Sequence, residues 1–119
     1  MKKLNWGIIG LGKIAESFSK GFFEVNNAKL LSVASTDVTK LKKFKEIHNL
    51  EEKYLFRNYE DLINCKEVDI VYIALPNSLH HYWVLKVIQN KKNVLVEKPA
   101  TTNLVEAKSI YDKVMDKKI

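Results

Sequence analysis

The chain has 119 residues, enough for one domain, and we expect residues 1–119 to form that domain. Hydrophobic residues make up 46% and charged residues 29%, ordinary values that exclude wholesale disorder. No apolar run approaches the roughly 20 residues of a membrane span, and Asn5, Gly10 and Gly12 interrupt the stretch that a signal peptide would need. The single cysteine, Cys65, excludes an internal disulfide and a multi-cysteine metal cluster, so we expect a cytoplasmic protein without a metal site.

Twenty basic and fourteen acidic residues give a formal charge of +6, which raises the question of nucleic-acid binding. Only Arg57 is an arginine, and the lysines are spread along the chain. Lysine lacks the planar guanidinium that binds phosphate and base edges bidentately. We therefore interpret the lysine clusters, such as residues 40–45, as solvated helix faces. The rival interpretation, a basic DNA-binding protein, predicts tight and salt-dependent binding to duplex DNA.

Hydrophobic periodicity predicts alternating strands and helices along the first half of the chain. A strand at Leu4–Ile9 precedes a helix from Lys13 to about Glu24, and a strand at Lys29–Ala34 precedes a helix from about Val38 to His48. Apolar residues at three- and four-residue spacing give each helix a stripe that can pack on a sheet. The stripes are Ile14, Phe18, Phe22 and Val25 in the first helix, and Leu41, Phe44 and Ile47 in the second.

The second half continues the alternation. Residues 53–56 can form a short strand and residues 59–64 a short helix. Residues 69–74 are continuously apolar after Asp69, which is typical of a strand covered on both faces. A helix from about Leu79 to Gln89, with His81, Val84, Leu85 and Ile88 as its inner face, a strand at Asn93–Val96 and a helix at about 103–117 complete the chain. This order predicts an α/β fold with a doubly wound, mostly parallel sheet.

A glycine turn joins the first strand to the first helix. Residues 10–15 read Gly-Leu-Gly-Lys-Ile-Ala, which fits the G-x-G-x-x-(G/A) pattern of dinucleotide-binding turns. The first glycine permits a tight turn, the second lets the backbone approach a pyrophosphate, and the small Ala15 lets the helix pack closely on the strand. The strand–turn–helix position makes this pattern much more specific than two glycines alone.

The residues after the second strand bear on the choice of nicotinamide cofactor. An acidic residue at the end of this strand holds the ribose 2′-hydroxyl of NAD, but this chain has Ser35 and Thr36 there. Their hydroxyls can hydrogen-bond to the 2′-phosphate of NADP, with Lys40 nearby. Asp37 can serve NAD, although capping the next helix is the more common role of such a residue. The sequence therefore allows NADP or NAD and favours NADP.

Polar residues also follow the last two strands of the predicted sheet. Asn77 or Ser78 can cap the helix that starts near Leu79, and of the two histidines that follow, His80 is the candidate for cofactor contact and His81 the structural one. The tripeptide Glu97-Lys98-Pro99 is either a solvated turn or a partly desolvated pair whose lysine exchanges a proton with a substrate hydroxyl.

Taken together, WGIIGLGKIA at 6–15, IALPNSLHHYWVLKVIQNKKNVLVEKP at 73–99 and the following TTNLVEA resemble the amino-terminal half of the glucose–fructose oxidoreductase/inositol 2-dehydrogenase/MocA family. The resemblance covers essentially the whole chain. It implies a Rossmann-type domain of an NAD(P)-dependent oxidoreductase acting on sugars, inositols and related polyols.

The resemblance also implies site residues. Lys98 matches the lysine that orients the substrate and takes part in proton transfer. The residues expected at the cofactor fall into three groups along the dinucleotide. They are Gly10, Leu11, Gly12, Lys13 and Ile14 at the pyrophosphate, Ser35 and Thr36 at the adenosine ribose, and Leu75, Pro76, Asn77, His80 and Glu97 along the nicotinamide side.

Members of this family are about twice as long or more, because a second domain supplies most of the substrate pocket. We therefore expect this chain to bind a dinucleotide but to be catalytically incomplete, and to self-associate through the apolar edge at residues 94–96. The alternative is a non-catalytic module that senses a dinucleotide or binds a partner, in which replacement of Lys98 would have no effect.

Overall fold

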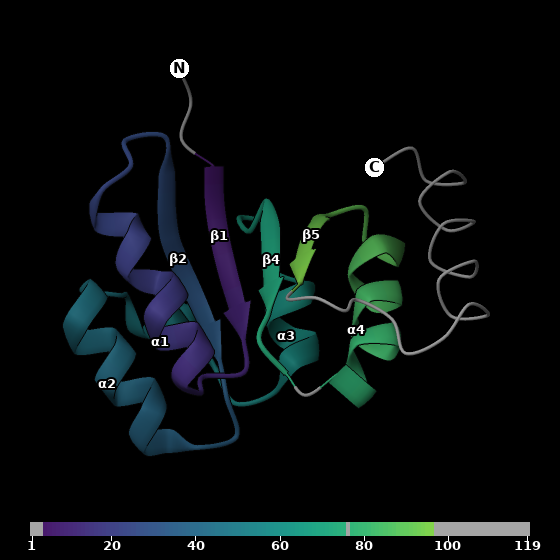
Figure 1. The fold of residues 1–119 in the computed structure, drawn as a ribbon, viewed down its shortest axis with the longest axis horizontal. Coiled ribbons are helices and arrows are strands. Elements are labelled where there is room, and N and C mark those ends of the chain that lie inside the picture. Colours follow the sequence, from purple (N-terminus) through teal and green to yellow (C-terminus); the bar gives the residue numbers. More distant parts are fainter. Residues whose placement is uncertain (1–3, 76, 97–119) are drawn as a thin grey trace.

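The computed structural model describes residues 4–75 and 77–96. Five strands form one parallel sheet in the order β3-β2-β1-β4-β5 (Figure 1). The strands are β1 (Leu4–Ile9), β2 (Ala28–Ala34), β3 (Leu55–Phe56), β4 (Ile70–Ile73) and β5 (Asn93–Val96). The helices are α1 (Lys13–Ser19), α2 (Val38–His48), α3 (Tyr59–Ile63) and α4 (Asn77–Gln89), with 3-10 turns η1 (Lys20–Phe23) and η2 (Glu52–Tyr54). The predicted doubly wound parallel sheet is confirmed.

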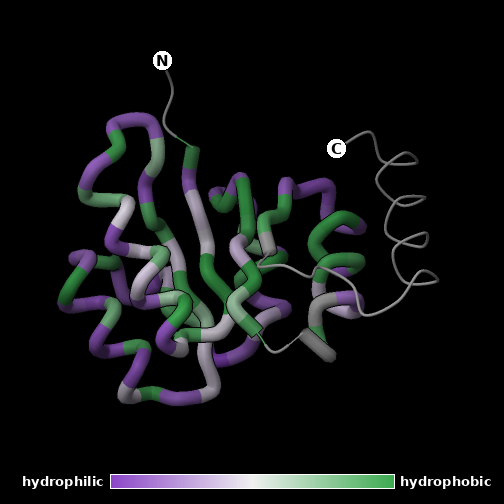
Figure 2. The backbone as a smooth tube through the Cα atoms, viewed as in Figure 1, coloured by the Kyte–Doolittle hydropathy of each residue, from purple (hydrophilic) through white to green (hydrophobic). Residues whose placement is uncertain are grey.

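Helices cover both faces of the sheet, and a hydrophobic core lies on each face. Successive side chains of the apolar strands point alternately into one core and the other. Ile8 and Tyr72 pack with residues of α1 and α2, whereas their neighbours Ile9 and Ile73 pack with residues of α3 and α4. Successive side chains of a strand point to opposite faces, so only a continuously apolar strand can serve two cores. Figure 2 shows α4 as largely apolar, while α2 alternates between apolar and hydrophilic residues.

Several element boundaries differ from the prediction. The first helix is α-helical only to Ser19 and continues as η1, and the third strand shrinks to Leu55–Phe56 because Tyr54 belongs to η2. Helix α4 begins at Asn77 rather than near Leu79. The prediction that Asn77 or Ser78 caps this helix is therefore wrong, since both lie inside its first turn. The helix expected at 103–117 lies outside the described residues.

The expected apolar stripes are wrong at their ends. Ile14, Val25 and Ile47 are 55%, 46% and 51% exposed. Phe44, in the middle of its stripe, is 1% exposed. Ile14 stands in the first turn of α1, beside the glycine turn. Helical periodicity identifies the side of a helix that faces the sheet but not how far along the helix the sheet extends.

At one edge of the described sheet lies β5, paired only with β4. Its Leu95 is 40% exposed. Self-association through this edge stays a prediction. No helix within the described residues is long and apolar enough to cross a membrane.

Candidate dinucleotide-binding site

The glycine turn after β1 is shaped by close contacts with the ends of two other strands. Gly10 has φ +87°, and a Cβ on it would lie 2.7 Å from the carbonyl oxygen of Ala74 and 2.7 Å from Cδ2 of Leu75. Its N–H donates to the carbonyl oxygen of Ala34 at the end of β2, at 3.1 Å. Only glycine combines this backbone conformation with so close an approach.

These contacts place the turn where the strand order reverses. The chain runs outward from β1 to β2 and β3, then crosses to the other side of β1 to form β4 and β5 (Figure 1). The carboxyl ends of β1 and β4 are therefore adjacent, and the connections that follow them leave in opposite directions. In doubly wound sheets the ligand crevice lies at this point.

Gly12 differs from Gly10 in having open space in front of it. A Cβ on Gly12 would meet no atom within 4 Å, and no side chain caps the start of α1. Lys13 and Ile14 are exposed there, while Ala15 is fully buried and lets the helix sit close to the sheet. The backbone thus leaves room for a phosphate beside the unpaired N–H groups of the first helical turn.

The structure refines the role expected for Leu11. Its side chain is only 3% exposed and belongs to the core on the α1–α2 side of the sheet. Only its backbone can contribute to a ligand site. At the predicted pyrophosphate position, Leu11 can thus contribute only backbone atoms, whereas the side chains of Lys13 and Ile14 are exposed.

At the end of β2, the side chains of Ser35 and Asp37 accept hydrogen bonds from backbone N–H groups. The Ser35 hydroxyl is buried and accepts a hydrogen bond from the Asp37 N–H at 3.0 Å. The Asp37 carboxylate caps α2 by accepting from the N–H groups of Thr39 at 2.9 Å and Lys40 at 3.4 Å. The capping role predicted for Asp37 is confirmed. Thr36 is exposed, so it is the more accessible of the two predicted ribose residues.

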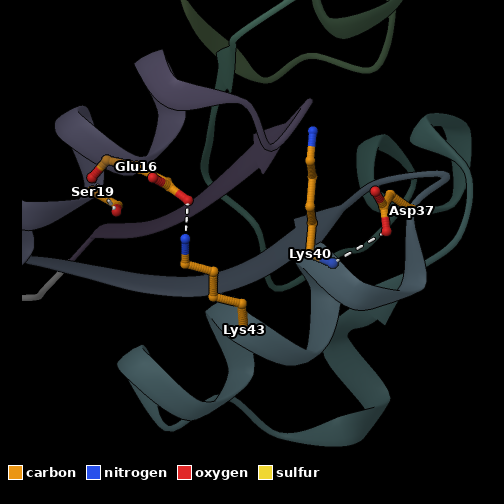
Figure 3. A network of polar contacts seen from close by, with 5 residues as sticks. All are labelled: Glu16, Ser19, Asp37, Lys40 and Lys43. Carbon is orange, nitrogen blue, oxygen red and sulfur yellow. Dashed lines mark hydrogen bonds and ion pairs between the residues drawn. The ribbon is translucent and has the colours of Figure 1, made fainter.

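Next to this segment, charged side chains connect α1 with α2 (Figure 3). The Lys43 ammonium forms an ion pair with the Glu16 carboxylate. This hydrogen bond, followed by the charge of Lys43, lowers the pKa of Glu16. Within the described part of the chain, the Lys40 ammonium has no hydrogen-bond or ion-pair partner. The Glu16–Lys43 pair could not be predicted from the sequence, because its members are 27 positions apart.

A second feature that sequence reasoning missed is a hollow beside Thr36. It has a volume of about 400 Å³, and its wall includes Tyr59 of α3 and Trp83 of α4. Their rings form a T-shaped pair with centroids 5.2 Å apart. Aromatic walls next to the end of β2 suit a planar ring system. Trp83 lies between His81 and Val84 of the predicted inner face, and helical spacing did not single it out.

The remaining predicted residues are described in part or not at all. Pro76, Glu97 and Lys98 lie outside the described residues. Asn77 and His80 lie in the first turn of α4, which starts near the end of β4, but their side chains are not described. His81 is half-buried, and its Nδ1 has no hydrogen-bond partner among the described residues. Across 4–75 and 77–96 no group of three or more His, Cys, Asp or Glu side chains could hold a metal ion.

Comparisons with known proteins agree with this geometry. The family described as "Oxidoreductase family, NAD-binding Rossmann fold" matches residues 4–118. Trans-1,2-dihydrobenzene-1,2-diol dehydrogenase of Xenopus laevis is 32% identical over 107 residues, which are 88% of this chain and 32% of that protein. D-xylose 1-dehydrogenase (NADP(+)) of Hypocrea jecorina is 30% identical over 127 residues, covering 98% of this chain and 32% of the relative.

A solved structure is similar over almost the entire chain. The 3-ketoreductase of Actinomadura kijaniata, in complex with NADP and TDP-benzene, has a TM-score of 0.90 and 26% identity, covering 98% of this chain and 35% of that one. The chain thus spans about a third of the length of the proteins that it matches. It belongs to the oxidoreductase family with an NAD-binding Rossmann fold, the family of glucose–fructose oxidoreductase, inositol 2-dehydrogenase and MocA.

Proposed function

We propose that this chain binds a nicotinamide dinucleotide, with NADP preferred over NAD, across the carboxyl ends of β1, β2 and β4. The observation that carries this proposal is the open space at Gly12, next to a turn that Gly10 holds against the β4–α4 connection. The backbone N–H groups of residues 12–14 would bind the pyrophosphate. Thr36 would bind the adenosine ribose directly, with Ser35 supporting the turn behind it.

The nicotinamide side of the proposed site lies beyond Leu75, where β4 ends and α4 begins. The residues that we propose there are Leu75, Pro76, Asn77, His80 and Glu97. The adenine would use the hollow walled by Tyr59 and Trp83, whose paired rings offer apolar contact to a planar base.

For the whole protein we propose oxidation or reduction at a hydroxyl-bearing carbon of a sugar, polyol or similar diol. Two relatives carry the names of such substrates, D-xylose and a dihydrobenzenediol. A bound nicotinamide would supply hydride-transfer chemistry at that carbon, and Lys98 would exchange the hydroxyl proton as acid or base. We propose that turnover needs a substrate-binding domain outside these 119 residues, and that the protein works in the cytoplasm.

Calorimetric titration of the purified chain with NADPH and, separately, NADH tests the cofactor proposal. We expect both to bind, with NADPH the tighter, and no measurable binding to a Gly12→Ala variant that is still folded. If the wild-type chain bound neither dinucleotide, the proposal would be wrong. Tighter binding of NADH would reverse the cofactor preference.

A further inference from the structure

Three charged side chains gather where the first turns of α1 and α2 approach each other. Glu16 is one helical turn beyond the open glycine, since its N–H donates to the Gly12 carbonyl at 3.1 Å. Lys40 is in the first turn of α2, where its N–H donates to the cap Asp37 at 3.4 Å. Lys43 lies one turn further along α2. Glu16 and Lys40 are thus close to the two loops that the proposed site uses.

The three side chains differ in what they contact. Lys43 extends from α2 across to Glu16 on α1, whereas Lys40 extends beside this pair without a partner among the described residues (Figure 3). The side chains of Lys43 and Glu16 are 53% and 38% exposed, so both charged groups of the pair are partly accessible to water. The pKa of Glu16 is lowered first by the hydrogen bond from Lys43, and the charges of Lys20 and Lys40 also contribute. Glu16 is therefore ionised at neutral pH, and its charge is offset by Lys43.

We propose that Lys43 is a positioning residue for cofactor selectivity: by holding Glu16 it stops this carboxylate from repelling the 2′-phosphate of NADP and from capturing Lys40. Lys40 then stays free to attract the phosphate. The nearby Asp37 carboxylate is already committed to the cap of α2. This inference rests on the proposed function and adds to it a residue that does not itself touch the cofactor.

The expected effect follows from the charges. The 2′-phosphate is a phosphomonoester with a charge of about −1.5 to −2 at neutral pH, whereas the 2′-hydroxyl of NAD is neutral. Without Lys43, the Glu16 carboxylate would either face the phosphate or pair with Lys40, and both weaken NADPH binding alone. Because the groups are exposed and screened by solvent, we expect NADPH to bind about threefold to tenfold more weakly in a Lys43→Met variant, with little change for NADH.

Four variants of the chain, titrated with NADPH and NADH at low and at physiological salt, test this inference. Lys42→Met is the matched control, because Lys42 is an exposed neighbour on the same helix and its replacement removes the same net charge. Lys43→Arg should keep the wild-type ratio of the two dissociation constants, since arginine can hold Glu16. The double variant Glu16→Gln/Lys43→Met should recover NADPH affinity, because the repelling carboxylate is gone. Circular dichroism confirms that each variant is folded.

The outcomes separate the inference from the proposed function. Equal weakening of NADPH and NADH by Lys43→Met, an equal effect of Lys42→Met, or no recovery in the double variant would overturn the inference and leave dinucleotide binding intact. If Lys43→Met does not fold, the single variant Glu16→Gln decides, because we expect it to bind NADPH at least as tightly as wild type. Weaker NADPH binding by Glu16→Gln would then overturn the inference. Failure of the wild-type chain to bind either dinucleotide overturns the proposed function and the inference together.

Discussion

Replacement of Gly10 by alanine should destabilise the fold through a contact that can be located to the atom. An alanine at φ +87° is strained by about 1–3 kcal/mol. Its Cβ would also lie 2.7 Å from the Ala74 carbonyl oxygen, a backbone atom that moves only if the β4–α4 connection moves. Such overpacking costs a further ~1–3 kcal/mol. We therefore expect a loss of about 2–6 kcal/mol in the free energy of unfolding.

Two other glycines serve as controls because a Cβ on either would meet no atom within 4 Å. Gly12→Ala should lower the free energy of unfolding by less than about 1 kcal/mol, since alanine is a poorer N-cap than glycine. It should nevertheless prevent dinucleotide binding, because the new methyl group occupies the space proposed for the pyrophosphate. Gly21→Ala, in η1, should change neither stability nor binding by more than about 0.5 kcal/mol.

The assay is guanidinium denaturation followed by tryptophan fluorescence, combined with titration of NADPH at a temperature where all three variants are folded. A total stability of about 6–18 kcal/mol is ordinary for a chain of this length, so Gly10→Ala should remain folded in the absence of denaturant unless wild type is at the low end. If Gly10→Ala were as stable as wild type, the tight contact with the Ala74 carbonyl would be wrong. If Gly12→Ala bound NADPH as wild type does, the open space would not be the pyrophosphate site.

Three further variants test single features of the structure. Asp37→Ala should lower the free energy of unfolding by about 1 kcal/mol through loss of the α2 cap, and NADH affinity should be retained; a large loss of it in titration would show that Asp37 binds the ribose instead. Lys92→Met should cost ~1–3 kcal/mol in guanidinium denaturation, because the Lys92 ammonium donates to the carbonyl oxygens of Cys65 at 2.7 Å and Val68 at 2.8 Å; wild-type stability would contradict this. Burial lowers the pKa of His48 below 6.5, so the unfolded chain takes up its proton first and stability should fall as the pH drops below 6.5. Below pH 6.5, the denaturation midpoint of His48→Gln should depend less on pH than that of wild type. An unchanged pH dependence would show that other groups cause the loss of stability.

The fold could be predicted because burial leaves a local pattern. Runs of apolar residues that a strand can bury on both faces predicted the bounds of β1 and β5. The same pattern predicted that β4 is covered on both faces. The glycine turn was also predictable, since the two glycines stand directly between a strand and a helix. Ile14 shows the limit, because an exposed apolar residue directly after the glycine turn has the same spacing as one that packs on the sheet.

The sequence by itself thus determined the parallel α/β architecture, the family and the position of the glycine turn between β1 and α1. The tertiary structure alone decided that Gly10 contacts the end of β4 and that Lys43 reaches Glu16 on another helix, and it confirmed that Asp37 caps α2. Burial of apolar side chains contributes strongly to stability and recurs at regular intervals along each helix or strand. The periodicity of apolar residues in the sequence therefore reveals it. An exposed ion pair contributes little to stability and leaves no periodic pattern in the sequence. The Glu16–Lys43 pair, whose members are far apart in the chain, can therefore be identified only once the fold has brought α1 and α2 together.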